Sequence, residues 1–166
     1  MIGYGKEDEH FVAELTYNYG VRTYKPGNVH IASLIKSSEI FTKALASSYI
    51  QSKSENSVLL KSPCGYNFEV FNNSEHPVCG VRLSSTNLER TEKFWTGLAK
   101  MTSKIENGTL TLKYDNSEIW MEFQKVDKID AADNYGRTAI AWPTTGLKEV
   151  EQKVTDFRQS LRNIMF

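Results

Sequence analysis

The sequence predicts an α+β fold in which one unit, a strand followed by a helix and further strands, recurs along the chain. Short segments alternate apolar and polar residues, as half-buried strands do. Longer segments between them space their apolar residues as amphipathic helices do. This order begins at Asn28, again at Val78 and a third time at Gly136. The spacing of roughly 50 to 60 residues is long enough for one supersecondary unit per repeat.

The predicted elements of the first half are four strands and one helix. The strands cover residues 10–18, 28–35, 57–62 and 66–72. A Pro26-Gly27 turn ends the loop between the first two strands. The helix covers residues 37–50, where apolar residues recur at helical spacing from Ile40 to Leu45.

The second half repeats this order. A strand at 78–85 precedes a helix at 86–101, which Thr86 and Glu89 open as a capping box. A hairpin of residues 108–115 and 118–126 follows, then a strand at 136–143 and a helix at 146–164. The strand starts therefore divide the chain into residues 1–27, the back half of a unit; 28–75 and 76–135, two whole units; and 136–166, the front half of a fourth.

Composition excludes several classes of protein. Hydrophobic residues make up 40% of 166 residues, enough to bury a core. Twenty basic residues balance twenty acidic ones without a basic block, which argues against a nucleic-acid or membrane partner. Cys64 and Cys79 have no metal-binding spacing and are interpreted as free thiols. We therefore expect a cytoplasmic location, with a mitochondrial one as the alternative.

A glutamate recurs in the last strand of each unit. Glu14, Glu69 and Glu122 are separated by 55 and 53 residues, which matches the repeat. Side chains alternate along a strand, so a curled sheet would bring these polar faces together in a groove. A carboxylate in such a groove must be paired, hydrated or bound to a cation.

His30 is the candidate ligand of a second kind. It lies in the first strand of the first whole unit, where strict alternation places it on the same face as Ala32 and Leu34. Two carboxylates and one imidazole suit a divalent ion such as zinc, nickel, manganese or iron, with water completing the coordination.

Which units pair decides which residues meet. If the two whole units pair, the groove contains His30, Glu69, Gly80 and Glu122, and Glu14 lies elsewhere. If the leading half unit pairs with the first whole one, Glu14 joins His30 and Glu69. A second chain in a homodimer would complete either groove.

The segments "FVAELTYNYG", "KPGNVHIASLI" and "PCGYNFEVFN", in this order, resemble glyoxalase I, or lactoylglutathione lyase. Nearly the whole chain is similar to tandem members of the vicinal oxygen chelate superfamily. The resemblance implies tandem βαβββ modules, that is, curled mixed sheets with helices outside and a metal groove between two modules.

The resemblance also implies a site. Glu14, His30 and Glu69 match three metal ligands, for zinc or nickel, and Asn18 matches the residue that holds the γ-glutamyl end of glutathione. Lys25, next to the position of the substrate-binding arginine, is the substitute for it that the resemblance implies. The substrate implied is the hemithioacetal of glutathione and a 2-oxoaldehyde such as methylglyoxal. Glu69 would move a proton between its adjacent carbons while the metal stabilises the enediolate.

Several positions depart from this pattern. The fourth ligand would precede Met1, and Pro26 stands where glyoxalase I has its arginine. Gly80 and Arg137 occupy the ligand positions of the later units, and Arg137 is predicted to pair with Glu122 instead of an ion. Two functions follow: a metal-dependent lyase or isomerase impaired by missing ligands, or a non-catalytic binding or scaffolding protein of the same fold.

Overall fold

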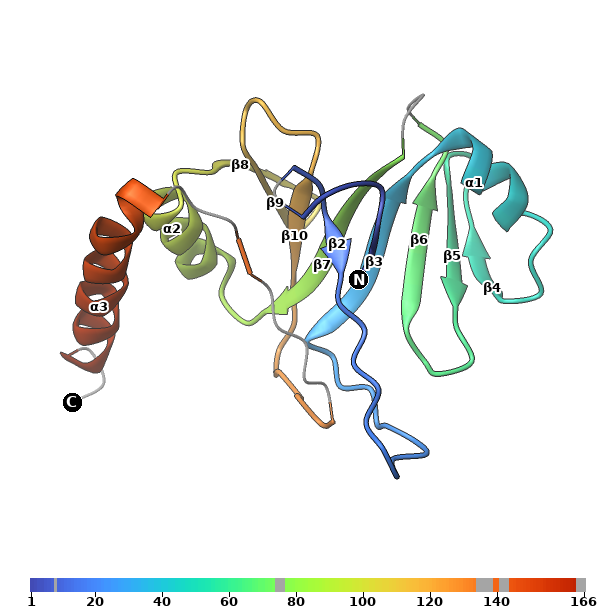
Figure 1. Cartoon of the computed structure of the whole chain (residues 1–166), viewed down its shortest axis with the longest axis horizontal. Coiled ribbons are helices and arrows are strands. Elements are labelled where there is room, and N and C mark those ends of the chain that lie inside the picture. Colours follow the sequence, from blue (N-terminus) through green and yellow to red (C-terminus); the bar gives the residue numbers. More distant parts are fainter. Residues whose placement is uncertain (8, 74–76, 134–138, 141–143, 164–166) are drawn as a thin grey trace.

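The chain is organised around one eight-stranded mixed sheet, as the computed structural model shows (Figure 1). The structure describes residues 1–7, 9–73, 77–133, 139–140 and 144–163, of which 78 and 158–163 are described by their backbone alone. The strands of this sheet are β3 (His30–Lys36), β4 (Ile50–Lys53), β5 (Ser57–Lys61), β6 (Asn67–Phe71), β7 (Val78–Ser85), β8 (Thr102–Glu106), β9 (Thr109–Lys113) and β10 (Trp120–Lys125).

Two units of the same topology form this sheet. In chain order, each has a strand, a helix and three strands: β3, α1 (Ser38–Ala44) and β4 to β6, then β7, α2 (Leu88–Leu98) and β8 to β10. The strand order is β4-β5-β6-β3-β7-β10-β9-β8. The first strand of each unit is parallel to its last, and the units meet where β3 runs antiparallel to β7. Of the three pairings considered from the sequence, the structure has the one that joins the two whole units.

Both helices pack on the same face of the sheet. Ile35 on β3 packs in the core under α1, while Val81 on β7 belongs to the core under α2. Ser33 pairs with Val81 and Ile35 pairs with Cys79, so these positions share a face. We call the opposite side of the sheet the open face. Along β3 it carries Ala32 and Leu34.

Both helices are shorter than their sequence patterns predict. The predicted helix at 37–50 ends at Ala44, and Ile50–Lys53 forms β4 against β5. The predicted helix at 86–101 ends at Leu98, with Asn87 rather than Thr86 as its N-cap, and Thr102–Glu106 forms β8 against β9. Pairing with a strand that arrives later in the chain outweighs local helix propensity at these ends.

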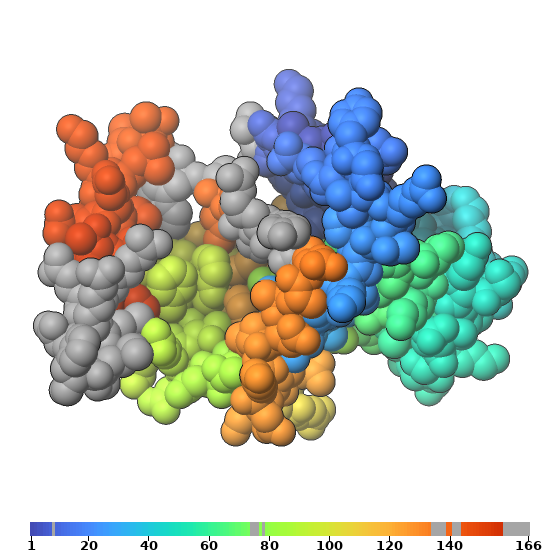
Figure 2. All heavy atoms as spheres, turned by 90° about the horizontal axis from the view of Figure 1, so that it is seen from below, coloured from blue at the N-terminus to red at the C-terminus, as the bar shows by residue number. Residues whose placement is uncertain are grey.

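The N-terminal segment lies outside the large sheet. The predicted strand at 10–18 is reduced to β2 (Val12–Ala13), which pairs with β1 (Ile2–Gly3). In the described part of the chain, β1 is the strand that pairs with this segment, and it has only two residues. Residues 25–28 then run against residues 128–133, with a bridge between Pro26 and Ala132. Figure 2 shows these two segments meeting on one face of the molecule.

The C-terminal segment is helical. A 3-10 turn (Thr144–Gly146) leads into α3 (Leu147–Asn163), and the Phe157 ring packs edge-on against Phe94 of α2 at 5.3 Å. The predicted strand at 136–143 falls largely outside the described residues. None of the described helices is long and apolar enough to cross a membrane.

Candidate functional site

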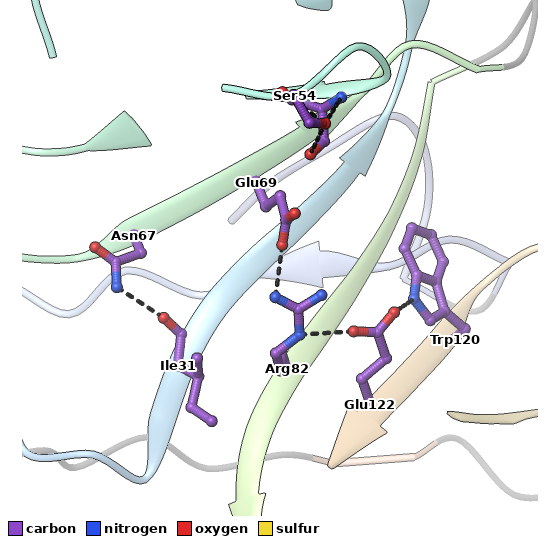
Figure 3. A network of polar contacts seen from close by, with 8 residues as sticks. Ile31, Ser54, Asn67, Glu69, Arg82, Trp120 and Glu122 are labelled. Carbon is purple, nitrogen blue, oxygen red and sulfur yellow. Dashed lines mark hydrogen bonds and ion pairs between the residues drawn. The ribbon is translucent and has the colours of Figure 1, made fainter. Parts of the chain in front are cut away.

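The polar centre of the open face lies where the two units meet, and Arg82 is its middle residue (Figure 3). Arg82 Nη1 donates to Glu69 Oε2 at 2.5 Å, and Arg82 Nε donates to Glu122 Oε2 at 2.7 Å. The other oxygen of Glu122 accepts a hydrogen bond of 2.9 Å from Trp120 Nε1. One guanidinium therefore joins the equivalent glutamates of the two units. We call Glu69, Arg82 and Glu122 the seam centre.

Strand register explains why one arginine reaches both glutamates. Arg82 on β7 has Glu122 on β10 as its direct neighbour. On the other side its neighbour is Ala32 on β3, and the next strand, β6, carries Glu69 beside Leu34. Ala32 is 1% exposed and offers only a methyl group, so the guanidinium can pass over it. A larger side chain at position 32 would block the bond to Glu69.

Gly80 makes room for the other end of the network. It is the direct neighbour of Trp120, and a Cβ on Gly80 would lie 2.5 Å from the Trp120 carbonyl oxygen and 2.7 Å from ring atom Cδ2. The indole packs into this space with 5% exposure and there donates to Glu122. The Lys36 ammonium lies over the same ring, 4.5 Å from its centroid.

The charges of the seam centre are partly shielded from solvent. The Arg82 side chain is 20% exposed, and those of Glu69 and Glu122 are 16% and 13% exposed. Burial disfavours the charged guanidinium, but the ion pairs and hydrogen bonds to Glu122 and Glu69 outweigh it and raise the pKa of Arg82. Arg82 is therefore a permanent cation between two carboxylates.

Two cavities flank this network. The first, of about 330 Å³, is lined on its polar side by Lys53, Asn67, Glu69, Arg82 and Gln124. The second, of about 260 Å³, lies beyond Glu122 and includes Lys36, Lys113 and Trp120. Each contains both charge signs and hydrogen-bonding groups, with apolar atoms between them. The first is within the size range of small-molecule sites.

Arg82 has hydrogen-bonding capacity left for the first cavity. A guanidinium has five N–H donors, and the described residues accept from its Nε and from one N–H of Nη1. Arg82 also lines the first cavity, together with Asn67. The Asn67 amide nitrogen is fixed by a 3.0 Å bond to the Ile31 carbonyl. The cavity thus offers the Arg82 guanidinium as a donor and the Glu69 carboxylate as an acceptor.

His30 lies on the other face of the sheet, which corrects the expectation that it shares a face with Ala32 and Leu34. A β-bulge between His30 and Ala32 shifts the register, so His30 pairs with Leu83 while Ala32 pairs with Arg82. Leu83 packs against the α2 core, so its partner His30 faces the helices.

The contacts of His30 agree with this placement. Its Nε2 lies 3.2 Å from Ser33 Oγ, and its ring packs edge-on against Tyr66 at 5.6 Å. Burial lowers the pKa of His30, against a weaker opposing effect of a backbone hydrogen bond.

The other expected site residues lie in the N-terminal segment, whose Phe11 packs against the core under α2, on the face of the sheet opposite the seam centre. Glu14 is exposed and follows the end of β2. Asn18 is exposed and donates to the Tyr24 hydroxyl at 2.7 Å. The Lys25 backbone N–H donates to Asp133 at 2.8 Å. The structure thus does not bring Glu14, Asn18 and Lys25 to Glu69.

A resident divalent metal does not fit the donor set of the seam. Within the described part of the chain, no group of three or more His, Cys, Asp or Glu side chains is placed to hold a metal ion. Both seam glutamates point at Arg82, and His30 is behind the sheet. Among the residues described, the expected set Glu14, His30 and Glu69 does not form a ligand shell.

The sequence interpretation missed Arg82. Glu122 was expected to pair with Arg137, which lies outside the described residues, whereas the structure pairs it with Arg82. The signal was available, because Arg82 follows Gly80 by two residues and therefore shares its face of the strand.

Comparison with known proteins agrees with this architecture. Residues 87–165 match the family model described as glyoxalase domain-containing protein 4-like, C-terminal domain. The chain is 31% identical to Glyoxalase 1 of Caenorhabditis elegans over 166 residues, covering 98% of the chain and 59% of that protein. It is 32% identical to glyoxalase domain-containing protein 4 of Mus musculus, covering 91% of the chain and 53% of that protein.

The chain belongs to the glyoxalase family of the vicinal oxygen chelate superfamily. The crystal structure of glyoxalase I from Zea mays superposes on this glyoxalase-like chain with a TM-score of 0.65 at 22% identity, covering 79% of the chain and 56% of the maize protein. That likeness establishes the vicinal oxygen chelate fold. The chain spans somewhat more than half the length of these relatives.

Proposed function

We propose that this chain is a glyoxalase-like domain that binds a small polar molecule in the first cavity, beside the seam centre. We propose also that it does not carry out metal-dependent lyase chemistry there. The observation that carries the proposal is Arg82 bonded to both Glu69 and Glu122. These carboxylates neutralise a guanidinium, so neither is a free metal ligand or a free base.

The first cavity supplies the recognition groups. Arg82 donates, Glu69 accepts, and the Asn67 and Gln124 amides can do both. Among the relatives, one from Oryza sativa subsp. japonica is named lactoylglutathione lyase, 29% identical with 53% of its length covered. Lactoylglutathione, the glutathione conjugate in that relative's name, carries carboxylate, ammonium and amide groups that complement this lining.

Titration with S-lactoylglutathione tests the binding, and an activity assay with the methylglyoxal–glutathione adduct tests the absence of lyase chemistry. We expect saturable binding by calorimetry, a loss of at least about tenfold in affinity in Gln124→Leu and Arg82→Met, and no turnover of the methylglyoxal–glutathione adduct with zinc or nickel present. Lys61→Met is the control for loss of a positive charge, because Lys61 pairs with Asn67 on the open face but does not line the cavity. Zinc-dependent turnover that Glu69→Gln abolishes would overturn it.

The second candidate is the metal-dependent lyase that uses Glu14, His30 and Glu69, with Asn18 and Lys25 binding the substrate. The match of these residues to the glyoxalase I motifs favours it, as does the name of the relatives. It requires Glu14, His30 and Glu69 to come together in an arrangement of the strands, or of two chains, that differs from the structure described. Stoichiometric zinc binding that is lost in His30→Ala would support this candidate over the first.

A further inference from the structure

We propose that Arg82 is the residue that excludes divalent cations from the seam centre. Its guanidinium occupies the place between Glu69 and Glu122 where a metal ion would bind. This inference rests on the proposed metal-free function and deepens it by naming the determinant. It begins from the two glutamates, because two carboxylates that are only 16% and 13% exposed need a positive charge between them.

The symmetry of the sheet gives two equivalent positions beside the two glutamates, and only one of them carries a cation. The units are related by an approximate two-fold axis through the facing pair Ser33 and Val81, as the paired positions on either side show. That axis relates Arg82, beside Glu122, to Leu34, beside Glu69. Leu34 is fully buried and apolar, so one of the two equivalent positions is charged. The seam thus has two carboxylates and one cation.

The guanidinium takes up the groups that a metal ion would need. Its N–H donors use Oε2 of both glutamates, and Trp120 uses the remaining oxygen of Glu122. A divalent ion placed there would have to displace a group of like charge and break both ion pairs. Lys36 does not serve as a substitute, because its ammonium lies over the Trp120 ring.

Replacing the guanidinium by an imidazole would complete a ligand set. Arg82 has Glu122 on the adjacent strand and Glu69 two strands away on the other side, and all three side chains are on the open face. Arg82→His would therefore give one histidine and two glutamates, three ligands of types that bind zinc, with the fourth position left for water. The change requires no further residue.

Zinc titration of the folded chain tests the inference. We expect Arg82→His to bind one zinc ion at least about tenfold more tightly than the wild type, and Arg82→Lys, which keeps the charge, to bind no better than the wild type. Arg82→His/Glu122→Gln and Arg82→His/Glu69→Gln should each lose at least about tenfold of the gained affinity. Circular dichroism verifies that each variant is folded.

Two outcomes would overturn the inference. One is a folded Arg82→His chain that binds zinc no better than the wild type. The other is wild-type binding that Glu69→Gln and Glu122→Gln both abolish. The first result leaves the proposed ligand binding intact, since that is measured with S-lactoylglutathione on the wild type. If the wild type did not bind S-lactoylglutathione but Arg82→His bound zinc more tightly than the wild type, the ligand proposal would be refuted and this inference would stand.

Discussion

Removing the charge of Arg82 is the perturbation whose size can be worked out from the structure. Arg82→Met keeps most of the aliphatic chain but leaves Glu69 and Glu122 ionised without a counter-charge, at 16% and 13% exposure. Breaking a buried ion pair by removing one partner costs about 3–5 kcal/mol. Because these side chains keep some contact with solvent, we expect the lower end, about 3 kcal/mol at pH 7.

Urea denaturation followed by tryptophan fluorescence measures this loss. In a chain of this length about 3 kcal/mol corresponds to a melting temperature lowered by roughly 6–12 °C. The matched control is Arg82→Met/Glu69→Gln/Glu122→Gln, in which no charge is left unpaired; it should recover most of the loss.

A loss below about 1 kcal/mol that the glutamine substitutions leave unchanged would refute the reasoning. It would mean that solvent screens the two glutamates at the seam as it does at an ordinary surface. The cation would then not be needed to hold the units together.

Three further predictions concern the surroundings of the seam and the helices. Gly80→Ala should destabilise the fold by about 1–3 kcal/mol in urea, because its Cβ would meet Trp120 backbone and ring atoms. The pKa of His30 is lowered in the folded chain, so its protonation favours unfolding. Stability should fall as pH drops below about 6.5, by at most about 1.4 kcal/mol per pH unit, and His30→Gln should remove that slope; an unchanged slope would contradict the buried placement. Asn87→Ala should cost about 1 kcal/mol, because the Asn87 side chain accepts from Arg90 N–H at 2.9 Å, and a cost within error would show that the cap is dispensable.

The recurrence of glutamates was the most informative signal in the sequence. The separation of 53 residues between Glu69 and Glu122 predicted equivalent positions, and the structure brings both to one guanidinium. The equivalence of the two glutamate positions follows from the repeat, which can be read from the sequence without knowing which strands pair. The partner was missed, because the residue that faces both strands depends on which strands become neighbours.

His30 and Glu14 show what a one-dimensional pattern cannot supply. Strict alternation put His30 on the open face, but one extra residue in a bulge reverses the face of everything before it. Glu14 lies in an alternating segment, yet a strand forms only where a neighbour satisfies its backbone, and here pairing stops at Ala13. In both cases non-local pairing decided the outcome.

Anomalous scattering at the zinc edge, from crystals of the wild-type chain grown with zinc, tests the central claim most directly. The account predicts electron density for the Arg82 guanidinium between Glu69 and Glu122, with no anomalous peak there. A zinc peak bonded to both glutamates, with Arg82 turned away, would contradict it.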